Sequence, residues 1–441
     1  MSNKGLPSRA VQKSPPTGLR ATRLWKRARS VKIRLWRFLG LSKPLALQAI
    51  ATKPAARPAL AKPGSPKPPP APSTLYNLAQ GHARTLARKV VALYIGDGAG
   101  AEFHVDLWLE YMQESEREVL VIVRSPFVFN VLKTRNDLDV VYVKEARDAE
   151  VLLTKCPKLK AVLYTSNTGN AIHFLRNNQL LHVFVGHGDS EKSASCHKFF
   201  RVYDEVWTAG QAHIDRFGNS GINFDGLRLV AVGRPSLASI LEQSTETVFG
   251  RFLYLPTWEG FYNEQLYSSV GEGIQFLQNI SLATGKQPVV KFHPWTGKQK
   301  KEFENCETTY RRAFPENCVT IIGRSSSVVN AVRDVDFLIA DISSVVTDFL
   351  PTQRPIFLYA PSDSGVRVAP SSMSYSEYCY EFADANSLLR LIEQVIVSGD
   401  DFLKDNRRKA LEYFIDVGAT RSDGFSRELD RVTGMVDAAS P

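Results

Sequence analysis

Residues 88–96, RKVVALYIG, predict a strand that is buried on both faces, because its apolar residues follow one another without alternating with polar ones. A glycine-rich turn comes next, and a helix is expected from Asp106 to Met112. Six further runs repeat the theme: VLVIV (119–123), VVYV (140–143), AVLYT (161–165), HVFVG (182–186), YDEVWTA (203–209) and LRLVAVG (227–233). Runs of this kind, separated by helices, are typical of a parallel sheet that is covered on both sides.

A second series of apolar runs begins after a break at residues 234–246, with a helix expected across residues 265–284. Its strand candidates are FLYLPTW (252–258), VVKFHP (289–294), CVTII (318–322), DFLIAD (336–341) and PIFLYA (355–360). We therefore expect an α/β protein with two Rossmann-like, doubly wound domains, at residues 76–240 and 241–441. A ligand crevice is expected between them, near the carboxyl ends of the strands.

Charge is distributed unevenly along the chain. The 441 residues carry 55 Lys+Arg and 45 Asp+Glu, a net charge of +10. Residues 1–75 hold 16 of the basic residues and no acidic one, which leaves a net charge of −6 on the rest. A duplex-binding domain needs its basic surface on the folded part. We therefore expect no nucleic-acid partner.

The basic segment, residues 1–75, is expected to be a disordered tail. Within it, residues 20–40, RATRLWKRARSVKIRLWRFLG, place apolar side chains at helical spacing, with basic side chains opposite and tryptophans beside the stripe. This pattern favours an amphipathic helix on an anionic membrane surface. The alternatives are a tail without such a role and a nucleic-acid or organelle-targeting segment. Residues 44–72, rich in Pro, Ala and Lys, predict an extended linker.

The cysteines and the lengths of the apolar runs restrict the compartment. Five cysteines form no CxxC pair, which argues for a reducing compartment and against a disulfide framework or a zinc ribbon. No apolar run reaches the roughly 18–20 residues of a spanning helix. We expect no metal site, and a protein that is neither secreted nor integral to the membrane.

Histidines follow one strand in each half of the chain. GHGDS, residues 186–190, places His187 between two glycines, whose backbone can approach a ligand closely. KFHPW, residues 291–295, places His293 before a proline that stops the strand. Either histidine alone could be structural. Two at strand ends that face one crevice favour a catalytic site.

A third motif, DISSVVTDF at residues 341–349, places Ser343 and Ser344 where a helix would begin after a strand. A helix cap accounts for one of these serines without any ligand. Alternatively, hydroxyls and amides at the start of a helix that faces a crevice would bind phosphate.

Together these motifs resemble the CDP-glycerol glycerophosphotransferases of teichoic-acid and capsule synthesis. The resemblance covers roughly residues 160–365 and rests on six strings in the same order: VGHGDS, YDEVWTAG, VGRPS, FLYLPTWEG, KFHP and DFLIADISSVVTDF. It implies a GT-B fold, with two Rossmann-like domains facing a cleft. It also implies an enzyme that moves glycerol phosphate from CDP-glycerol to an acceptor hydroxyl and releases CMP, with no cofactor.

The resemblance assigns roles by position. His187 would be the general base that takes the acceptor's proton, and His293 would contact the donor pyrophosphate and stabilise the leaving CMP. Ser343 and Ser344 would hold the phosphates. The two flanking aspartates of the family correspond to Asp341 and Asp348, and we include both in the donor site.

The sequence departs from the family in two places. Gly186 and Gly188 belong to the acceptor loop, but Asp189 stands where many members have threonine, so the resemblance does not define the acceptor. The residues after His293 also differ. The basic partner of the pyrophosphate would be Lys298 or Arg324.

The expected partners are CDP-glycerol, a membrane-linked glycan or polyol-phosphate acceptor, and an anionic membrane surface that binds residues 20–40. The expected place is the cytoplasmic face of the cell membrane, with peripheral attachment. Two other functions remain open: a GT-B glycosyltransferase that uses a nucleotide sugar, and a non-catalytic protein that binds a membrane or a polymer.

Overall fold

The computed structural model describes residues 83–189, 195–243, 245–260, 268–324, 326–361 and 372–434. All of these residues lie in one unit, Pro68–Pro441. The predicted basic tail, residues 1–75, with its membrane helix and linker, lies outside the described residues. In the part of the chain that is described, no helix is both long and apolar enough to cross a membrane.

The first sheet has seven strands, and every neighbouring pair is parallel. Its order, β3-β2-β1-β4-β5-β6-β7, reverses direction between β1 and β4, as in doubly wound folds. The strands are β1 (Val91–Ile95), β2 (Val119–Val123), β3 (Val140–Tyr142), β4 (Ala161–Tyr164), β5 (Leu181–Phe184), β6 (Glu205–Thr208) and β7 (Arg228–Ala231). Each strand overlaps a run predicted from the sequence.

The second sheet has six parallel strands in the order β10-β9-β8-β11-β12-β13. They are β8 (Arg251–Leu255), β9 (Gln287–Lys291), β10 (Thr320–Ile322), β11 (Leu338–Asp341), β12 (Ile356–Tyr359) and β13 (Tyr380–Phe382). The prediction of two doubly wound parallel sheets is confirmed. The sequence analysis missed β13, a three-residue edge strand whose middle residue, Glu381, is exposed. Such a strand carries no run that is apolar on both faces.

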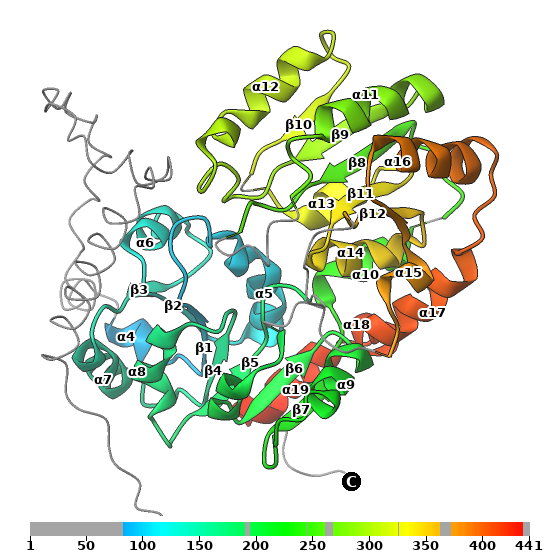
Figure 1. Cartoon of the computed structure of the whole chain (residues 1–441). Coiled ribbons are helices and arrows are strands. Elements are labelled where there is room, and N and C mark those ends of the chain that lie inside the picture. Colours follow the sequence, from blue (N-terminus) through cyan, green and yellow to red (C-terminus); the bar gives the residue numbers. More distant parts are fainter. Residues whose placement is uncertain are drawn as a thin grey trace, which may run out of the picture. The chain divides into compact units, whose positions relative to one another are not determined.

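Helices cover both faces of each sheet (Figure 1). Beside the first sheet lie α4 (Ala83–Leu86), α5 (Phe103–Gln113), α6 (Pro126–Leu132), α7 (Ala146–Lys155), α8 (Ile172–Leu175) and α9 (Gln211–Asn219). The remaining helices are α10 (Ala238–Leu241), α11 (Gly273–Thr284), α12 (Cys306–Ala313), α13 (Val328–Val332), α14 (Ser344–Phe349), α15 (Tyr375–Tyr378), α16 (Ala385–Ile392), α17 (Lys404–Phe414), α18 (Val417–Arg421) and α19 (Gly424–Thr433). Helix α11 begins at Gly273, later than the expected residue 265, and residues 270–272 form a turn before it.

Strand β1 shows why the strands carry no polar alternation. Val91, Leu93 and Ile95 pack with α5, α6 and α19 on one face. Ala92 and Tyr94 pack with α4, α7, α8 and α9 on the other face. All five side chains are 0% exposed. Two helix layers therefore require apolar residues at every position of the strand.

The last described helix, α19, returns to the first sheet (Figure 1). Phe425 packs its ring 5.0 Å from that of Trp108 on α5 and 5.5 Å from that of Trp207 on β6. Because aromatic pairs in this distance range attract one another beyond simple burial, they fasten the helix to the sheet. The second predicted domain, residues 241–441, thus sends its final helix back to the first sheet.

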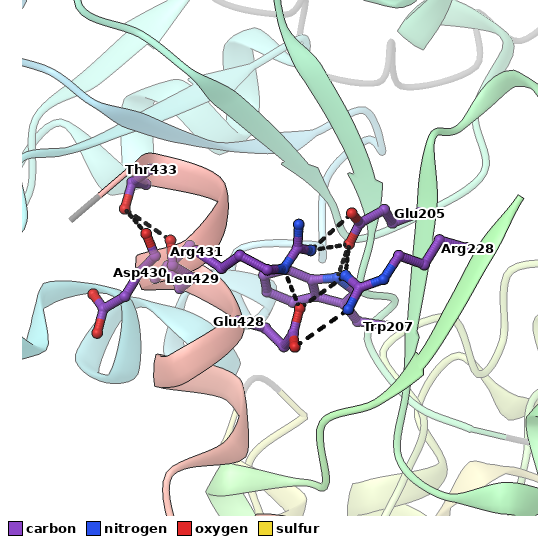
Figure 2. Close-up of polar contacts among 8 residues, drawn as sticks. All are labelled: Glu205, Trp207, Arg228, Glu428, Leu429, Asp430, Arg431 and Thr433. Atoms are coloured by element: carbon purple, nitrogen blue, oxygen red, sulfur yellow. Dashed lines mark hydrogen bonds and ion pairs between the residues drawn. The ribbon is translucent and has the colours of Figure 1, made fainter. Parts of the chain in front are cut away.

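A polar network borders this contact (Figure 2). Glu205 is 4% exposed and accepts hydrogen bonds from Trp207 Nε1 at 2.8 Å and Arg228 Nη1 at 3.0 Å. Arg431 on α19 donates to both oxygens of Glu205, at 2.6 and 2.7 Å. Glu428 bonds to both arginines. One buried carboxylate therefore holds two cations from separate elements.

We predict that Glu205→Gln lowers the free energy of unfolding by about 2 kcal/mol, because an amide cannot satisfy both guanidinium groups and the indole N–H. Urea denaturation followed by circular dichroism measures the change. The control is Glu150→Gln, which breaks an exposed ion pair with Arg176 and should cost under about 1 kcal/mol. Equal losses in the two variants would contradict a structural role for the Glu205 network.

Candidate active site

A cavity of about 440 Å³ opens where the carboxyl ends of the two sheets face one another. From the first sheet it is lined by the segment after β1, by α5 and by the segments after β5 and β7. From the second sheet it is lined by the segments after β8, β9, β10 and β11. This is the position predicted for the ligand crevice from the strand pattern.

The cavity brings together seven of the predicted site residues, namely His187, Gly188, His293, Arg324, Ser343, Ser344 and Asp348. The other four, Gly186, Asp189, Asp341 and Lys298, do not belong to its lining. The loops approach closely here: a Cβ atom on Gly188 would lie 2.7 Å from Ser344 Oγ. A side chain at position 188 would push the serine out of place.

Hydrogen bonding fixes the proton of His187. Its Nδ1 lies 2.7 Å from the carbonyl oxygen of Thr165, at the end of β4. A carbonyl oxygen can only accept, so Nδ1 carries the proton and the lone pair of the neutral ring is on Nε2. Gly186 supports this position with a φ of 70°, which favours glycine, and its carbonyl accepts from Trp108 Nε1 at 2.8 Å. His187 is therefore arranged as a proton acceptor.

His293 has the opposite arrangement. The backbone N–H of Trp295 donates to His293 Nδ1 at 3.1 Å. Because Nδ1 accepts, the proton of the neutral ring is on Nε2. The ring is stacked on Trp258, with 6.1 Å between centroids and 23° between planes. One cavity thus holds one imidazole set to accept a proton and one set to donate a hydrogen bond.

Asp348 is buried and faces the first sheet. Arg234, in the VGRPS string, places Nη2 3.4 Å from Asp348 Oδ1 and 3.4 Å from the carbonyl oxygen of His187. Burial raises the pKa of Asp348 and Arg234 opposes that rise. Arg234 lines the cavity and is 6% exposed, but the sequence analysis did not single it out.

Asp341 holds the backbone around the site. Its Oδ2 accepts from the N–H groups of Thr257 at 2.7 Å and Ser269 at 3.1 Å. Ser343, the residue before α14, donates its hydroxyl to the carbonyl of Asp341 at 3.1 Å and does not cap the helix. Asp341 therefore fixes the segment after β8, and it is 0% exposed.

Asp189, predicted in the acceptor loop, lies in a buried ion pair. Arg216 on α9 donates to its two oxygens at 2.5 and 2.6 Å, and His213 Nδ1 is 3.6 Å away. Burial alone would raise the pKa of Asp189, but Arg216 and His213 bring it below its ordinary value. The carboxylate therefore ties the loop to α9. The aspartate that stands here in place of threonine has Arg216 as its partner.

The two predicted cationic partners differ. Lys298 is exposed, with Nζ 4.4 Å from the centre of the Trp295 ring. Arg324 lines the cavity but is bonded to Glu307 and to the carbonyl of Thr296, both at 2.7 Å. Lys298 thus lies outside the cavity lining, and the guanidinium of Arg324, inside it, is already bonded to protein groups.

Lys291 is a cation that the sequence analysis quoted in KFHP but did not assign. It is 5% exposed, lines the cavity and donates to the carbonyl of Arg324 at 2.9 Å. Burial lowers its pKa to about 8. Within the described ranges, Lys291 forms no ion pair with a carboxylate. A buried ammonium without an anionic partner suits an anionic ligand.

His104 is a second residue that the sequence analysis missed, in a region without a recognised motif. It lies on α5, is 3% exposed, and stacks on His187. In the described part of the chain, no cluster of three or more His, Cys, Asp or Glu side chains could hold a metal ion.

Two doubly wound sheets with a cavity at their carboxyl ends define an α/β fold of the GT-B type. Residues 239–366 match the sequence model of one family, CDP-Glycerol:Poly(glycerophosphate) glycerophosphotransferase. The match confirms the resemblance found from the motifs and indicates a glycerophosphotransferase enzyme. A comparison with curated protein sequences finds no match.

Solved structures with the same fold include the wall teichoic acid polymerase TagF. One TagF variant is 15% identical, with a TM-score of 0.55, and the match covers 82% of this chain and 92% of that one. A TagF variant soaked with CDPG is 13% identical, with a TM-score of 0.54 and the same coverage. S. aureus MnaA in complex with UDP is 10% identical, with a TM-score of 0.52 over 80% of this chain and 99% of that one. At these identities the likeness shows the fold.

We predict that Lys291→Met weakens binding of inorganic pyrophosphate about tenfold or more at pH 7, because a charge-assisted hydrogen bond is lost. Lys298→Met, on the exposed side chain, should change it less than about twofold. Isothermal titration calorimetry measures both. Wild-type affinity should fall as the pH rises above 8, where Lys291 loses its proton, more steeply than in Lys291→Met. Parallel pH curves would contradict the role of Lys291.

Proposed function

We propose that the chain transfers a glycerol-phosphate unit from CDP-glycerol to a hydroxyl of a membrane-linked glycan or polyol-phosphate polymer and releases CMP. The family match at residues 239–366 supports the donor. The observation that carries the proposal is a pair of histidines with opposite tautomers in one cavity. His187 is arranged to accept a proton and His293 to donate a hydrogen bond. Such a transfer removes a proton from the attacking hydroxyl and places negative charge on the leaving oxygen, and the two histidines suit these two tasks.

The acceptor is activated by His187 in this scheme. Its Nε2 takes the proton of the acceptor hydroxyl as the oxygen attacks the phosphorus that bears glycerol. The bond from that phosphorus to the bridging oxygen breaks, and its electrons leave with CMP. The imidazolium that forms on His187 lies near the Asp348 carboxylate, whose pKa is affected by the charge of His187.

The leaving group is stabilised from the second sheet. His293 donates through Nε2, and Lys291 supplies a positive charge from the end of β9. Ser343 and Ser344, which line the same cavity, are the proposed hydroxyl contacts of the donor phosphates. Arg324, fixed by Glu307, supports the loop rather than the phosphate. No cofactor or metal takes part.

The test is CMP release by the full chain with CDP-glycerol and a synthetic poly(glycerol phosphate) primer. His187→Ala should lower the rate by about 10²–10⁴-fold, the range attributed to a general base. The control, His173→Ala, removes a histidine on α8 outside the cavity lining and should leave the rate unchanged. Full activity of His187→Ala would refute its role as base.

The same assay separates the competing functions. Release of UDP or GDP from a nucleotide sugar, with none of CMP from CDP-glycerol, would instead assign a glycosyltransferase, because the fold does not determine the reaction. Binding of the primer without turnover of any donor would assign a non-catalytic polymer-binding protein.

We also propose that residues 20–40 bring the enzyme to the anionic cytoplasmic face of the cell membrane, where a lipid-linked acceptor would lie. Each basic residue near such a surface contributes about 1 kcal/mol. Deleting residues 1–43 should move the protein from sedimenting phosphatidylglycerol vesicles to the supernatant, with activity on the soluble primer retained. Equal sedimentation of the full and truncated chains would contradict this attachment.

A further inference from the structure

The ring of His104 lies flat against the ring of His187. Their centroids are 4.3 Å apart and their planes differ by 12°. The ring of Phe103 lies nearly perpendicular to the ring of His187, with 6.4 Å between centroids. One face of His187 is therefore covered by an aromatic surface, which restricts rotation of the imidazole about its bond to Cβ.

Thr165 binds both histidines. Its carbonyl accepts from His187 Nδ1, as described above, and its hydroxyl lies 3.0 Å from His104 Nδ1. The hydroxyl proton is donated to the carbonyl of Tyr94 at 3.3 Å. The Thr165 oxygen must therefore accept from His104, so Nδ1 of His104 carries its proton. One residue at the end of β4 thus defines the tautomer of both stacked rings.

His104 is held neutral. Burial lowers its pKa well below the ordinary value, and the nearby His187 lowers it further. The charged groups around the pair are Asp97 after β1, 3.9 Å from His104 Nδ1, Asp348 on α14 and Arg234, which bonds to the carbonyl of His187. Two rings in contact cannot both be charged at low cost, so His104 stays neutral when His187 takes the acceptor's proton in the proposed reaction.

We propose that His104 is a positioning residue for proton transfer: its neutral ring is the platform that orients His187 Nε2 toward the acceptor hydroxyl and stabilises the imidazolium that forms. A neutral aromatic face against a cation is attractive. The inference rests on the proposed role of His187 as the base, and it adds a residue from the part of the chain that matches no motif.

Kinetics of three variants separate the two contacts of His104. His104→Phe keeps the stacked ring and loses the hydrogen bond to Thr165. His104→Asn keeps a donor near the Nδ1 position and loses the ring, and His104→Ala loses both. We expect kcat for CMP release to fall about 10- to 100-fold in the Asn and Ala variants, as for a misaligned catalytic group, and to remain within about threefold of wild type in the Phe variant. KM for CDP-glycerol should change less than about twofold in all three, because donor contacts are unaltered.

A second measurement does not depend on turnover. In ¹⁵N-histidine-labelled protein, with the His187 signals assigned by their loss in His187→Gln, neutral His187 should show a protonated Nδ1 and an unprotonated Nε2. His104→Phe should keep this pattern, whereas His104→Asn should give a mixture of tautomers, because the ring is free to turn away from the Thr165 carbonyl.

Absence of CMP release by the wild type would refute the proposed function, and the tautomer measurement would still decide the role of His104. Equal kcat in the Phe and Asn variants would overturn the platform. An unchanged tautomer in His104→Asn would overturn it as well. If His104→Ala fails to fold, as shown by its thermal melt, the comparison of Phe with Asn remains decisive.

Discussion

The hydrogen bond from His187 Nδ1 to the Thr165 carbonyl determines which atom in the cleft can accept a proton. It leaves Nε2 as the atom that can take a proton, while the Trp295 amide imposes the opposite tautomer on His293. Both bonds use backbone groups just beyond parallel strands, β4 and β9. At His187 the direction is set by the sheet itself, because Thr165 directly follows β4 and its N–H still bonds to Tyr94 of β1.

Most of the cationic side chains that line the cleft are paired with a carboxylate. The chain beyond residue 75 has a net charge of −6, so an anionic ligand has to be bound by particular groups and not by a basic surface. Arg324 and Arg234 each have a carboxylate partner, at 2.7 and 3.4 Å. Lys291 lies at the end of a buried strand and donates to a carbonyl oxygen. An incoming phosphate would recover part of the desolvation cost of that ammonium, which makes Lys291 the natural centre for anion binding.

The sequence predicts strands better than it predicts partners. Burial on both faces leaves a continuous apolar run in the inner strands, as in β1, and even the less buried strands β7 and β10 keep enough apolar residues to be predicted. Among the described strands, β13 is the one that was not predicted. His187 and His293 could be found because strand ends and glycines mark them. The partner of Asp189 could not, since Arg216 lies 27 residues further along the chain and meets the carboxylate only through the fold. No sequence motif marks His104, which lies on α5. Its proposed role depends on its contact with Thr165, 61 residues further along the chain.

The C-terminal segment has a direct part in the cleft. Its backbone packs against the ends of β6 and β7 so closely that a Cβ atom on Gly210 would lie 2.6 Å from the carbonyl of Phe414, and one on Gly233 2.5 Å from the amide of Thr420. Thr420 also accepts from the backbone N–H of Arg234 at 2.9 Å. Arg234 in turn reaches Asp348 and the carbonyl of His187. Helix α19 returns to the first sheet, where Glu205 and Phe425 hold it. These contacts fix the position of the C-terminal segment that includes Thr420. The C-terminal segment therefore helps to position Arg234, which contacts the loop that carries His187.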